Sequence, residues 1–269
     1  MVGVMGAREG AFGRATFFAI REPVAGHAHP FMHLLFKTGG GDRRLLIEGQ
    51  ERVLSDAQSL LINPWQRHSD DPIQAEQPTT MLALYIERAW MDKRFGPAVG
   101  FAQNLGLADA PVRGLVQQVS GAICEPSGLD AVAFEAVIAD LIEAASSAVL
   151  VNRGAQEMCD FRIRRARRQL EAHPHLHIDL GGVARAAGLS RSHFYEQFRS
   201  GIGVAPHMFM DALVLEQAYR MMHSRQSLDD IAKSLGFAAQ SSFSRFFKDR
   251  VGFPPSTIRR QIGQRVRRD

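Results

Sequence analysis

The sequence predicts an α+β protein of two domains, with an all-β N-terminal barrel or sandwich that carries a helical layer, and an all-helical C-terminal domain. Short apolar runs alternate with turns between residues 15 and 68, which is typical of short strands. A nearly duplicated helical pattern occupies residues 180–255. The net charge also changes sign between the two parts. We therefore expect domains at 1–151 and 160–269, joined by a linker at 152–159.

The duplicated pattern predicts two helix-turn-helix units. In each copy a short amphipathic helix is followed by a turn at a glycine, Gly188 or Gly236, and by a second helix with phenylalanines at positions i and i+4. Glycine suits such a turn because it adopts positive φ without strain, and Ser190 can cap the second helix of the first copy. Matches before the turn have an offset of 48 and those after it an offset of 49, so the second turn contains one added residue. The matched pairs are Val183/Ile231, Ala184/Ala232, Gly188/Gly236, Phe194/Phe243, Phe198/Phe247, Gly203/Gly252 and Pro206/Pro255.

Positive charge is concentrated in the part that carries the repeat. Residues 156–269 hold 19 Lys and Arg against 11 Asp and Glu, whereas residues 1–155 hold 13 against 17. A helical bundle without a nucleic-acid role is the alternative, but this charge favours a module that binds phosphates. A run of arginines before the repeat would by itself be a solvated helix face; beside two helix-turn-helix units we expect it to contact phosphates. The run consists of Arg162, Arg164, Arg165, Arg167 and Arg168.

These motifs resemble the C-terminal domain of the AraC/XylS family of bacterial transcription regulators, over roughly residues 160–260. The resemblance rests on Val183-Ala184, Ser190-Arg191-Ser192-His193-Phe194, Ile231-Ala232, Leu235-Gly236-Phe237, Phe243-Ser244-Arg245-Phe246-Phe247-Lys248, Gly252-Phe253-Pro254-Pro255 and Arg259. It implies two helix-turn-helix units joined by a long helix, here about residues 205–223. Such a helix would span roughly 28 Å, near the roughly 34 Å between successive major grooves on one face of B-DNA. One monomer could then contact two adjacent half-sites of double-stranded promoter DNA.

The resemblance also implies which side chains face DNA. Glutamine can pair with adenine, and arginine with guanine or phosphate. A carboxylate at Glu196 is unfavourable beside phosphates, so Arg191 and Tyr195 are expected to contribute more in the first unit. Val214 stands where the family usually has a basic residue, which affects one supporting contact of the connecting helix. The expected DNA-binding residues are Arg191, Ser192, Tyr195, Glu196, Gln240, Ser241, Ser242, Ser244 and Arg245, with Arg165 on the phosphates.

The spacing of histidine, glycine and proline in the N-terminal part is similar to that of cupin barrels, which serve as sensor domains in many AraC-family regulators. The pattern consists of Gly26-His27-Ala28-His29, His33, Gly49, Pro64 and His68. It implies a cupin-like β-barrel whose interior binds a small-molecule effector. The candidate effector-binding residues are His27, His29, His33, Trp65 and His68, and Phe31, Leu35, Leu61 and Tyr85 are either further lining or ordinary core.

The histidines are also candidate metal ligands. An H-x-H pair on a strand projects both rings to one face, and two more histidines fall where metal-binding cupins have their remaining ligands. Four imidazoles would suit Zn, Ni or Fe. The alternative is that the H-x-H pair lies at the barrel entrance, hydrogen bonded or solvated, without a metal. The four candidate ligands are His27, His29, His33 and His68.

A helical layer is expected after the strands. Helical spacing covers residues 112–123 and about 129–151, on either side of the turn Glu125-Pro126-Ser127-Gly128. Acidic residues interrupt the second helix well before it reaches the length of a membrane span. In similar regulators, helices at this position pair two subunits, so a homodimer is expected, with packing inside one subunit as the alternative.

The expected function is a cytoplasmic, ligand-responsive transcription regulator, not an enzyme, with RNA polymerase as a further partner if it is an activator. Cys124 and Cys159 are too few for a disulfide framework, which fits a reducing cytoplasm. Apart from the histidines, the sequence shows no Ser-His-Asp arrangement, phosphate loop or carboxylate pair. Two alternatives stay open: a metal-dependent cupin enzyme fused to a DNA-binding tail, and a DNA-repair adaptor that uses the same helical pair.

Overall fold

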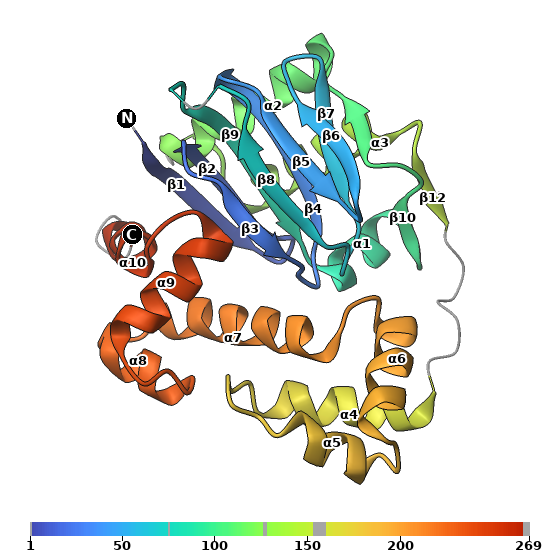
Figure 1. Ribbon diagram of the computed structural model, residues 1–269. Helices are drawn as coiled ribbons and strands as arrows, with labels where there is room; N and C mark the ends of the chain where they lie inside the picture. Colours follow the sequence, from blue (N-terminus) through green and yellow to red (C-terminus); the bar gives the residue numbers. More distant parts are fainter. Residues whose placement is uncertain (1, 75, 126–127, 153–159, 266–269) are drawn as a thin grey trace. The chain divides into compact units, whose positions relative to one another are not determined.

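The computed structural model describes residues 2–74, 76–125, 128–152 and 160–265 (Figure 1). Within them, strands occur only up to Asn152, and the later part is helical, which confirms the predicted two-domain α+β class. The chain divides into two compact units, one of Met1–Ala25, Pro30–Pro64 and His68–Gly154, and the other of Gly26–His29, Trp65–Arg67 and Ala155–Asp269.

The N-terminal strands form two main sheets, one of six strands in the order β1-β2-β9-β4-β7-β11 and one of four in the order β3-β8-β5-β6, beside the small pair β10-β12. The described strands make open sheets, and none of these sheets closes into a barrel. The predicted apolar runs became β2, β4, β5 and β7, whereas β1 and β9 were not expected from the sequence. The strands are β1 (Gly3–Gly10), β2 (Gly13–Ile20), β3 (Val24–His27), β4 (Met32–Gly40), β5 (Arg43–Ile47), β6 (Gln50–Leu54), β7 (Gln58–Ile62), β8 (His68–Pro72), β9 (Thr79–Ile86), β10 (Val99–Phe101), β11 (Leu105–Leu107) and β12 (Leu150–Asn152).

The hairpin of β5 and β6 illustrates why these residues form strands. Along β5, Arg43, Leu45 and Ile47 are buried while the two residues between them are exposed, as expected when side chains alternate between the faces of a sheet. The connecting turn places Glu48 and Gly49 at φ values of 48° and 79°. Positive φ at both central residues is what a tight hairpin turn requires.

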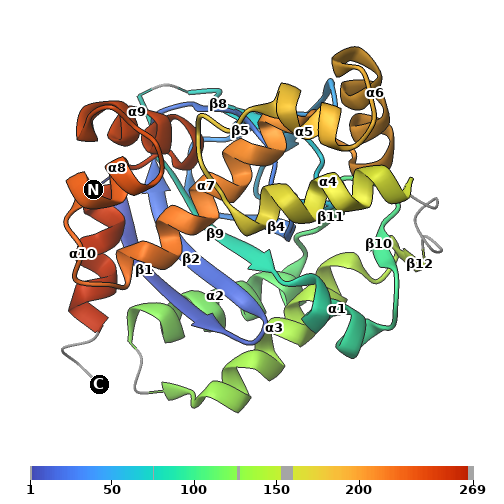
Figure 2. The same cartoon turned by 90° about the horizontal axis from the view of Figure 1, so that it is seen from below.

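Helices α2 (Ala110–Cys124) and α3 (Ala131–Ser146) cover one face of the six-stranded sheet (Figures 1 and 2). Each begins at an aspartate whose side chain accepts a hydrogen bond from the backbone three residues later, Asp109 from Val112 and Asp130 from Ala133, which satisfies a free N–H of the first turn. Apolar side chains of both helices share one core with the sheet, including Leu34, Phe36, Leu84, Val116, Val119, Ile138 and Leu141.

The prediction that the second helix runs to Val151 is wrong. It ends at Ser146, and Leu150–Asn152 form β12, paired with β10. A short helix α1 (Arg88–Phe95) also follows β9. Among the described residues, no helix has the length and apolar character needed to cross a bilayer. Residues 126–127 of the expected turn, residues 153–159 of the expected linker, and with them Cys159, lie outside the described residues.

The C-terminal unit consists of seven described helices, connected by short loops (Figure 2). Its core contains aromatic and aliphatic side chains from the successive helices, and the phenylalanines of the repeat are fully buried as predicted. The helices are α4 (Phe161–Ala172), α5 (Leu180–Ala186), α6 (Arg191–Ile202), α7 (Pro206–Met222), α8 (Leu228–Ser234), α9 (Gln240–Val251) and α10 (Pro255–Arg265).

Candidate nucleic-acid interface and sensor site

Helix α4 presents a cationic face. Two of its five arginines are ion paired, Arg162 with Asp160 and Arg167 with Glu171, each at 2.7 Å. Hydrogen bonds from Arg162 hold the pKa of the Asp160 carboxyl below its usual value, so this pair is charged at neutral pH. The arginines that are exposed and form no ion pair with any described residue are Arg164, Arg165 and Arg168.

The first helix-turn-helix unit consists of α5 and α6. Gly188 closes the turn with φ of 69°, and Ser190 Oγ accepts a hydrogen bond from the His193 amide at 3.3 Å, which caps α6. Phe194 and Phe198 are fully buried, so the opposite face of α6 points to solvent. Of the predicted DNA-binding residues, Arg191, Ser192 and Glu196 are exposed there and Tyr195 is half-buried.

The second unit consists of α8 and α9. Residues 235–239 separate these helices, whereas residues 187–190 separate α5 from α6, so the added residue lies in the second turn as predicted. Gly236 has φ of 91°. Ala239 precedes α9 and offers no side-chain cap. The predicted residues Gln240, Ser241, Ser242 and Arg245 are exposed on α9, and Ser244 is half-buried.

Helix α7 joins the two units. Its 17 residues correspond to a length of about 25 Å. Ring contacts attach a recognition helix near each end, Phe198 to Phe209 and Phe247 to Tyr219, both with centroids 5.2 Å apart. Val214, where the family usually has a basic residue, is fully buried. An apolar side chain fits this position because it fills the core there.

An ion pair also holds the second recognition helix on α7. Arg250 of α9 donates to Asp211 of α7 at 2.6 Å, and both side chains are about one quarter exposed, at 23% and 27%. The Arg250 guanidinium also lies 4.0 Å from the centroid of the Phe246 ring. Both recognition helices are therefore fixed to the same central helix.

Two of the four candidate histidines, His27 and His29, lie together in one compact unit, with ring centroids 5.9 Å apart. His68 begins β8 in the other unit. The expectation of an H-x-H pair on one strand is wrong, because β3 ends at His27 and His29 lies beyond it.

His33 makes its contacts within the N-terminal sheets. It lies on β4, is buried, and its Nδ1 is 3.0 Å from the carbonyl oxygen of Leu84. The ring stacks on Tyr85 with centroids 4.3 Å apart, and its centroid is 5.6 Å from that of His68. A backbone carbonyl can only accept a hydrogen bond, so Nδ1 of His33 is the donor in this contact.

One candidate lining residue is ordinary core, and another lies outside the N-terminal unit. Leu61 belongs to the core between the six-stranded sheet and helices α2 and α3. Trp65 is grouped with the second compact unit, in the segment Trp65–Arg67. By contrast, Phe31 and Leu35 are buried, and Phe31 makes an edge contact with Tyr85 at 6.2 Å.

The family comparison agrees with the geometry of the second unit and most of the first. The model described as "Helix-turn-helix domain" matches residues 183–261. The chain carries an AraC-type helix-turn-helix domain. This confirms the family resemblance derived from the repeat, with α5 to α9 as its two helix-turn-helix units.

Two curated relatives, both named as transcriptional regulators, match less than a third of this chain. The chain is 33% identical over 88 residues to the probable transcriptional regulator LumQ of Photobacterium leiognathi, which covers 32% of this chain and 36% of LumQ. It is 36% identical over 76 residues to the raffinose operon regulatory protein RafR of Pediococcus pentosaceus, which covers 28% of this chain and 27% of RafR. The chain thus spans about a third of the length of the curated relatives it matches.

Solved structures show similarity of fold over both units. An apo form of a ToxT variant from Vibrio cholerae matches with a TM-score of 0.64 and 12% identity, over 95% of this chain and 100% of that one. ToxT with a bound unsaturated fatty acid matches with a TM-score of 0.58 and 12% identity, over 96% and 94%. The N-terminal sheets and the AraC-type domain therefore both have counterparts of the same fold.

Sequence reasoning missed a buried arginine in the N-terminal sheets. The side chain of Arg43 is fully buried, forms an ion pair with Asp70 and donates to the Glu22 carbonyl at 2.8 Å, yet its Nη1 has no partner among the described residues. Burial raises the pKa of the Asp70 carboxyl despite the neighbouring guanidinium. The signal was present, because Arg43 is in phase with the buried Leu45 and Ile47 of β5.

Proposed function

We propose that this protein is a ligand-responsive transcription regulator that binds promoter DNA through α6 and α9 and senses a small molecule with its N-terminal sheets. The observation that carries the proposal is the pair of recognition helices anchored on α7, each with a polar exposed face over a buried aromatic core. The free arginines of α4 add cationic charge suited to phosphates. Relatives of this domain are named as transcriptional regulators, which favours a regulator over an enzyme and over a repair adaptor.

The test is binding of the full chain to the DNA upstream of its own and neighbouring genes. Fluorescence anisotropy at moderate salt should show tight binding to at least one promoter fragment, and excess bulk DNA should not displace the protein from it. The reason is that the affinity for a specific site exceeds the affinity for non-specific DNA by roughly 10³-fold or more. Equal affinity for all fragments would contradict the proposal and would favour the repair-adaptor alternative. A footprint should then cover two neighbouring half-sites.

We propose that the two N-terminal sheets bind the small-molecule effector, as a cupin-like sensor domain would. Buried polar groups with free hydrogen-bonding capacity, such as Arg43 Nη1, are what an enclosed ligand site needs. A neighbour of the same fold was solved with a fatty acid bound, which supports a role in ligand binding here. A ligand found by a thermal-shift screen should change promoter affinity, and equal affinity with and without it would contradict sensing.

The candidate histidines support a metal-binding variant of this proposal. The pair of His27 and His29, with ring centroids 5.9 Å apart, offers imidazole ligands that suit Zn, Ni or Fe, and a metal would add a structural or effector-coordinating role. Elemental analysis of gently purified protein tests it: we expect one metal per chain, lost in His27→Ala with His29→Ala. Metal loss that leaves transcriptional control intact would favour the enzyme alternative or a purely structural ion.

We further propose a homodimer that works in the cytoplasm and contacts RNA polymerase if it activates transcription. Helices α2 and α3 are the expected pairing elements, although both bury a face against the sheet of their own chain. Light scattering coupled to size-exclusion chromatography should give twice the mass of one chain. A monomer at micromolar concentration would exclude the dimer and leave these helices with a role inside one subunit.

A further inference from the structure

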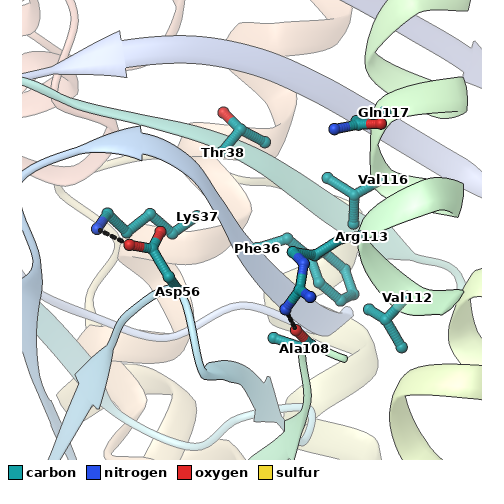
Figure 3. A pocket seen from close by; sticks show the side chains of 9 residues that line it. All are labelled: Phe36, Lys37, Thr38, Asp56, Ala108, Val112, Arg113, Val116 and Gln117. Carbon is teal, nitrogen blue, oxygen red and sulfur yellow. Dashed lines mark hydrogen bonds and ion pairs between the residues drawn. The ribbon is translucent and has the colours of Figure 1, made fainter. Parts of the chain in front are cut away.

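A cavity of about 100 Å³ lies between β4, the turn before β7 and helix α2 (Figure 3). It exists because β4 and β7 stop pairing at Leu35 and Leu60. Beyond this point the two strands diverge, so two consecutive residues of β4, Phe36 and Lys37, both border the gap although they belong to opposite faces of the strand. The cavity is lined within the N-terminal unit and shares no residue with the candidate histidines.

One end of the cavity is apolar. Phe36, Val112 and Val116 are buried and belong to the core under α2; their side chains gather on one side of the space (Figure 3). An engineered apolar cavity of roughly 150 Å³ holds benzene, so the smaller space here suits an aliphatic chain of three or four carbon atoms.

The positive charge of Lys37 is already compensated. Its side chain is 5% exposed, and Nζ lies 2.7 Å from Asp42 and 3.1 Å from Asp56. Burial lowers the pKa of Lys37, but the hydrogen bonds from the ammonium group to the two carboxylates outweigh this effect and raise it overall. Lys37 therefore stays an ammonium group that is bound to acids of the protein itself.

Arg113 supplies the uncompensated charge of the lining. Its guanidinium donates to the Ala108 carbonyl at 2.5 Å, and no described acid forms an ion pair with it. The residue is exposed at the mouth of the cavity beside Gln117. A guanidinium has five N–H donors and can bind a carboxylate with two of them, so donors of Arg113 are available to an anion.

We infer that this cavity binds a short-chain aliphatic monocarboxylate, with its alkyl end against Phe36, Val112 and Val116 and its carboxylate on Arg113. The ligand would connect the sheet to α2, at a site separate from the histidines. This deepens the proposed sensing role and rests on it for any effect on DNA. Binding of the ligand itself does not require DNA, so the two proposals can fail independently.

Calorimetric titration of the full chain with sodium butyrate tests the inference, with butyramide as a neutral ligand of the same size and sodium chloride as the salt control. Butyrate should bind saturably in the millimolar range, and butyramide about tenfold more weakly, because it lacks the charge-assisted hydrogen bonds. Equal binding of both compounds, or no saturable heat with butyrate, would overturn the inference.

Matched variants locate the binding. Arg113→Gln should weaken butyrate binding about tenfold, whereas Arg94→Gln, an exposed arginine of α1 outside the cavity, should not change it. Thr38→Trp, at an exposed position of the lining, should block the cavity without altering the core. Unchanged binding in a folded Arg113→Gln protein, verified by its circular dichroism, would place the ligand elsewhere and refute the inference. Loss of promoter binding in any of these proteins would bear on the proposed function only.

Discussion

The first and second helix-turn-helix units bury the same aromatic pattern but begin their helices differently. In both units the two phenylalanines are fully buried, and the recognition helix ends at a glycine in the left-handed region, Gly203 and Gly252. Ser190 caps the recognition helix of the first unit, while Ala239 leaves that of the second without a side-chain cap. The second unit has instead a capping box on its first helix, α8.

Their exposed faces also differ. The first presents Arg191, Ser192 and Glu196, and the second presents Gln240 and Arg245 with a pair of serines. The comparison teaches that buried apolar positions specify the motif, whereas exposed positions are free to diverge. Because a carboxylate beside phosphates weakens binding and Gln and Arg can each pair with a base edge, we expect the second unit to discriminate sequences and the first mainly to position the protein.

The largest effect is expected from substitutions of the buried phenylalanines that both units share. Phe198→Ala and Phe247→Ala should each lower the free energy of unfolding by about 3–5 kcal/mol, because a large buried ring is replaced by a cavity. Urea unfolding of the full chain followed by circular dichroism measures both. Phe161→Ala is the control, since that residue is 68% exposed, and it should change stability by less than about 0.5 kcal/mol. A cost below about 1 kcal/mol in only one unit would show that the two cores are not equivalent.

The next largest effect concerns DNA affinity and distinguishes the exposed faces of the two recognition helices. Arg245→Ala should weaken promoter binding by about 1–3 kcal/mol and relax the preference at one base pair. Glu196→Ala should leave affinity unchanged or raise it, because it removes a negative charge near DNA. Anisotropy titrations against the promoter site and its single-base variants measure both quantities. A larger loss from Glu196→Ala than from Arg245→Ala would reverse the assignment of the two units.

Phosphate contacts on α4 should be independent of sequence. Arg165→Ala is expected to weaken binding to all DNA fragments alike and to reduce the slope of log affinity against log salt by about one. Arg167→Ala is the matched control, because Arg167 is already paired with Glu171 at 2.7 Å, and its effect should be smaller. Salt titrations of both variants test this, and base-specific losses in Arg165→Ala would contradict it.

The smallest effects come from the caps. Ser190→Ala and Ser227→Ala should each lower the free energy of unfolding by about 1 kcal/mol. Only the cost of Ser227→Ala should depend on pH. Hydrogen bonds from Ser227 hold the pKa of Asp230 below its ordinary value of 3.8. A depressed folded pKa gives stability that is present above the unfolded pKa and lost as pH falls through the folded one.

Urea unfolding at neutral pH and at a series of pH values that passes below the folded pKa of Asp230, itself lower than 3.8, distinguishes the two caps. The cost of Ser227→Ala should shrink over this range, because the capping box loses its carboxylate. Ser190 faces the amide of His193 and has no acid partner in its cap, so the cost of Ser190→Ala should stay constant across the same range.

The AraC-type domain was predictable because its signals are local. Gly188, Gly236 and the paired phenylalanines determine turns and buried faces within a few residues, and the structure has α7 at Pro206–Met222, within one residue of the expected range at each end. The N-terminal unit depends on long-range pairing. Strand β1 is an edge strand with few buried positions, so its sequence carries a weak apolar alternation.

The arrangement of the candidate sensor residues also depends on long-range pairing and could not be predicted from local sequence. Nothing in the local spacing shows that β3 ends at His27, or that His33 stacks on Tyr85 of the neighbouring strand. The cavity beside Arg113 arises where two strands diverge, which no single segment encodes. Arg43 was predictable in principle, because its phase along β5 is that of Leu45 and Ile47.

Helix α7 has a consequence for how this molecule can be controlled. Since Phe209 of α7 contacts Phe198 of the first unit and Tyr219 of α7 contacts Phe247 of the second, neither unit can swing independently without separating these rings. In the proposed regulator, an upstream signal can therefore change whether the domain engages its operator, but not the number of base pairs between the two halves of that operator. Inserting or deleting half a turn of DNA between these halves should be as harmful with effector as without it.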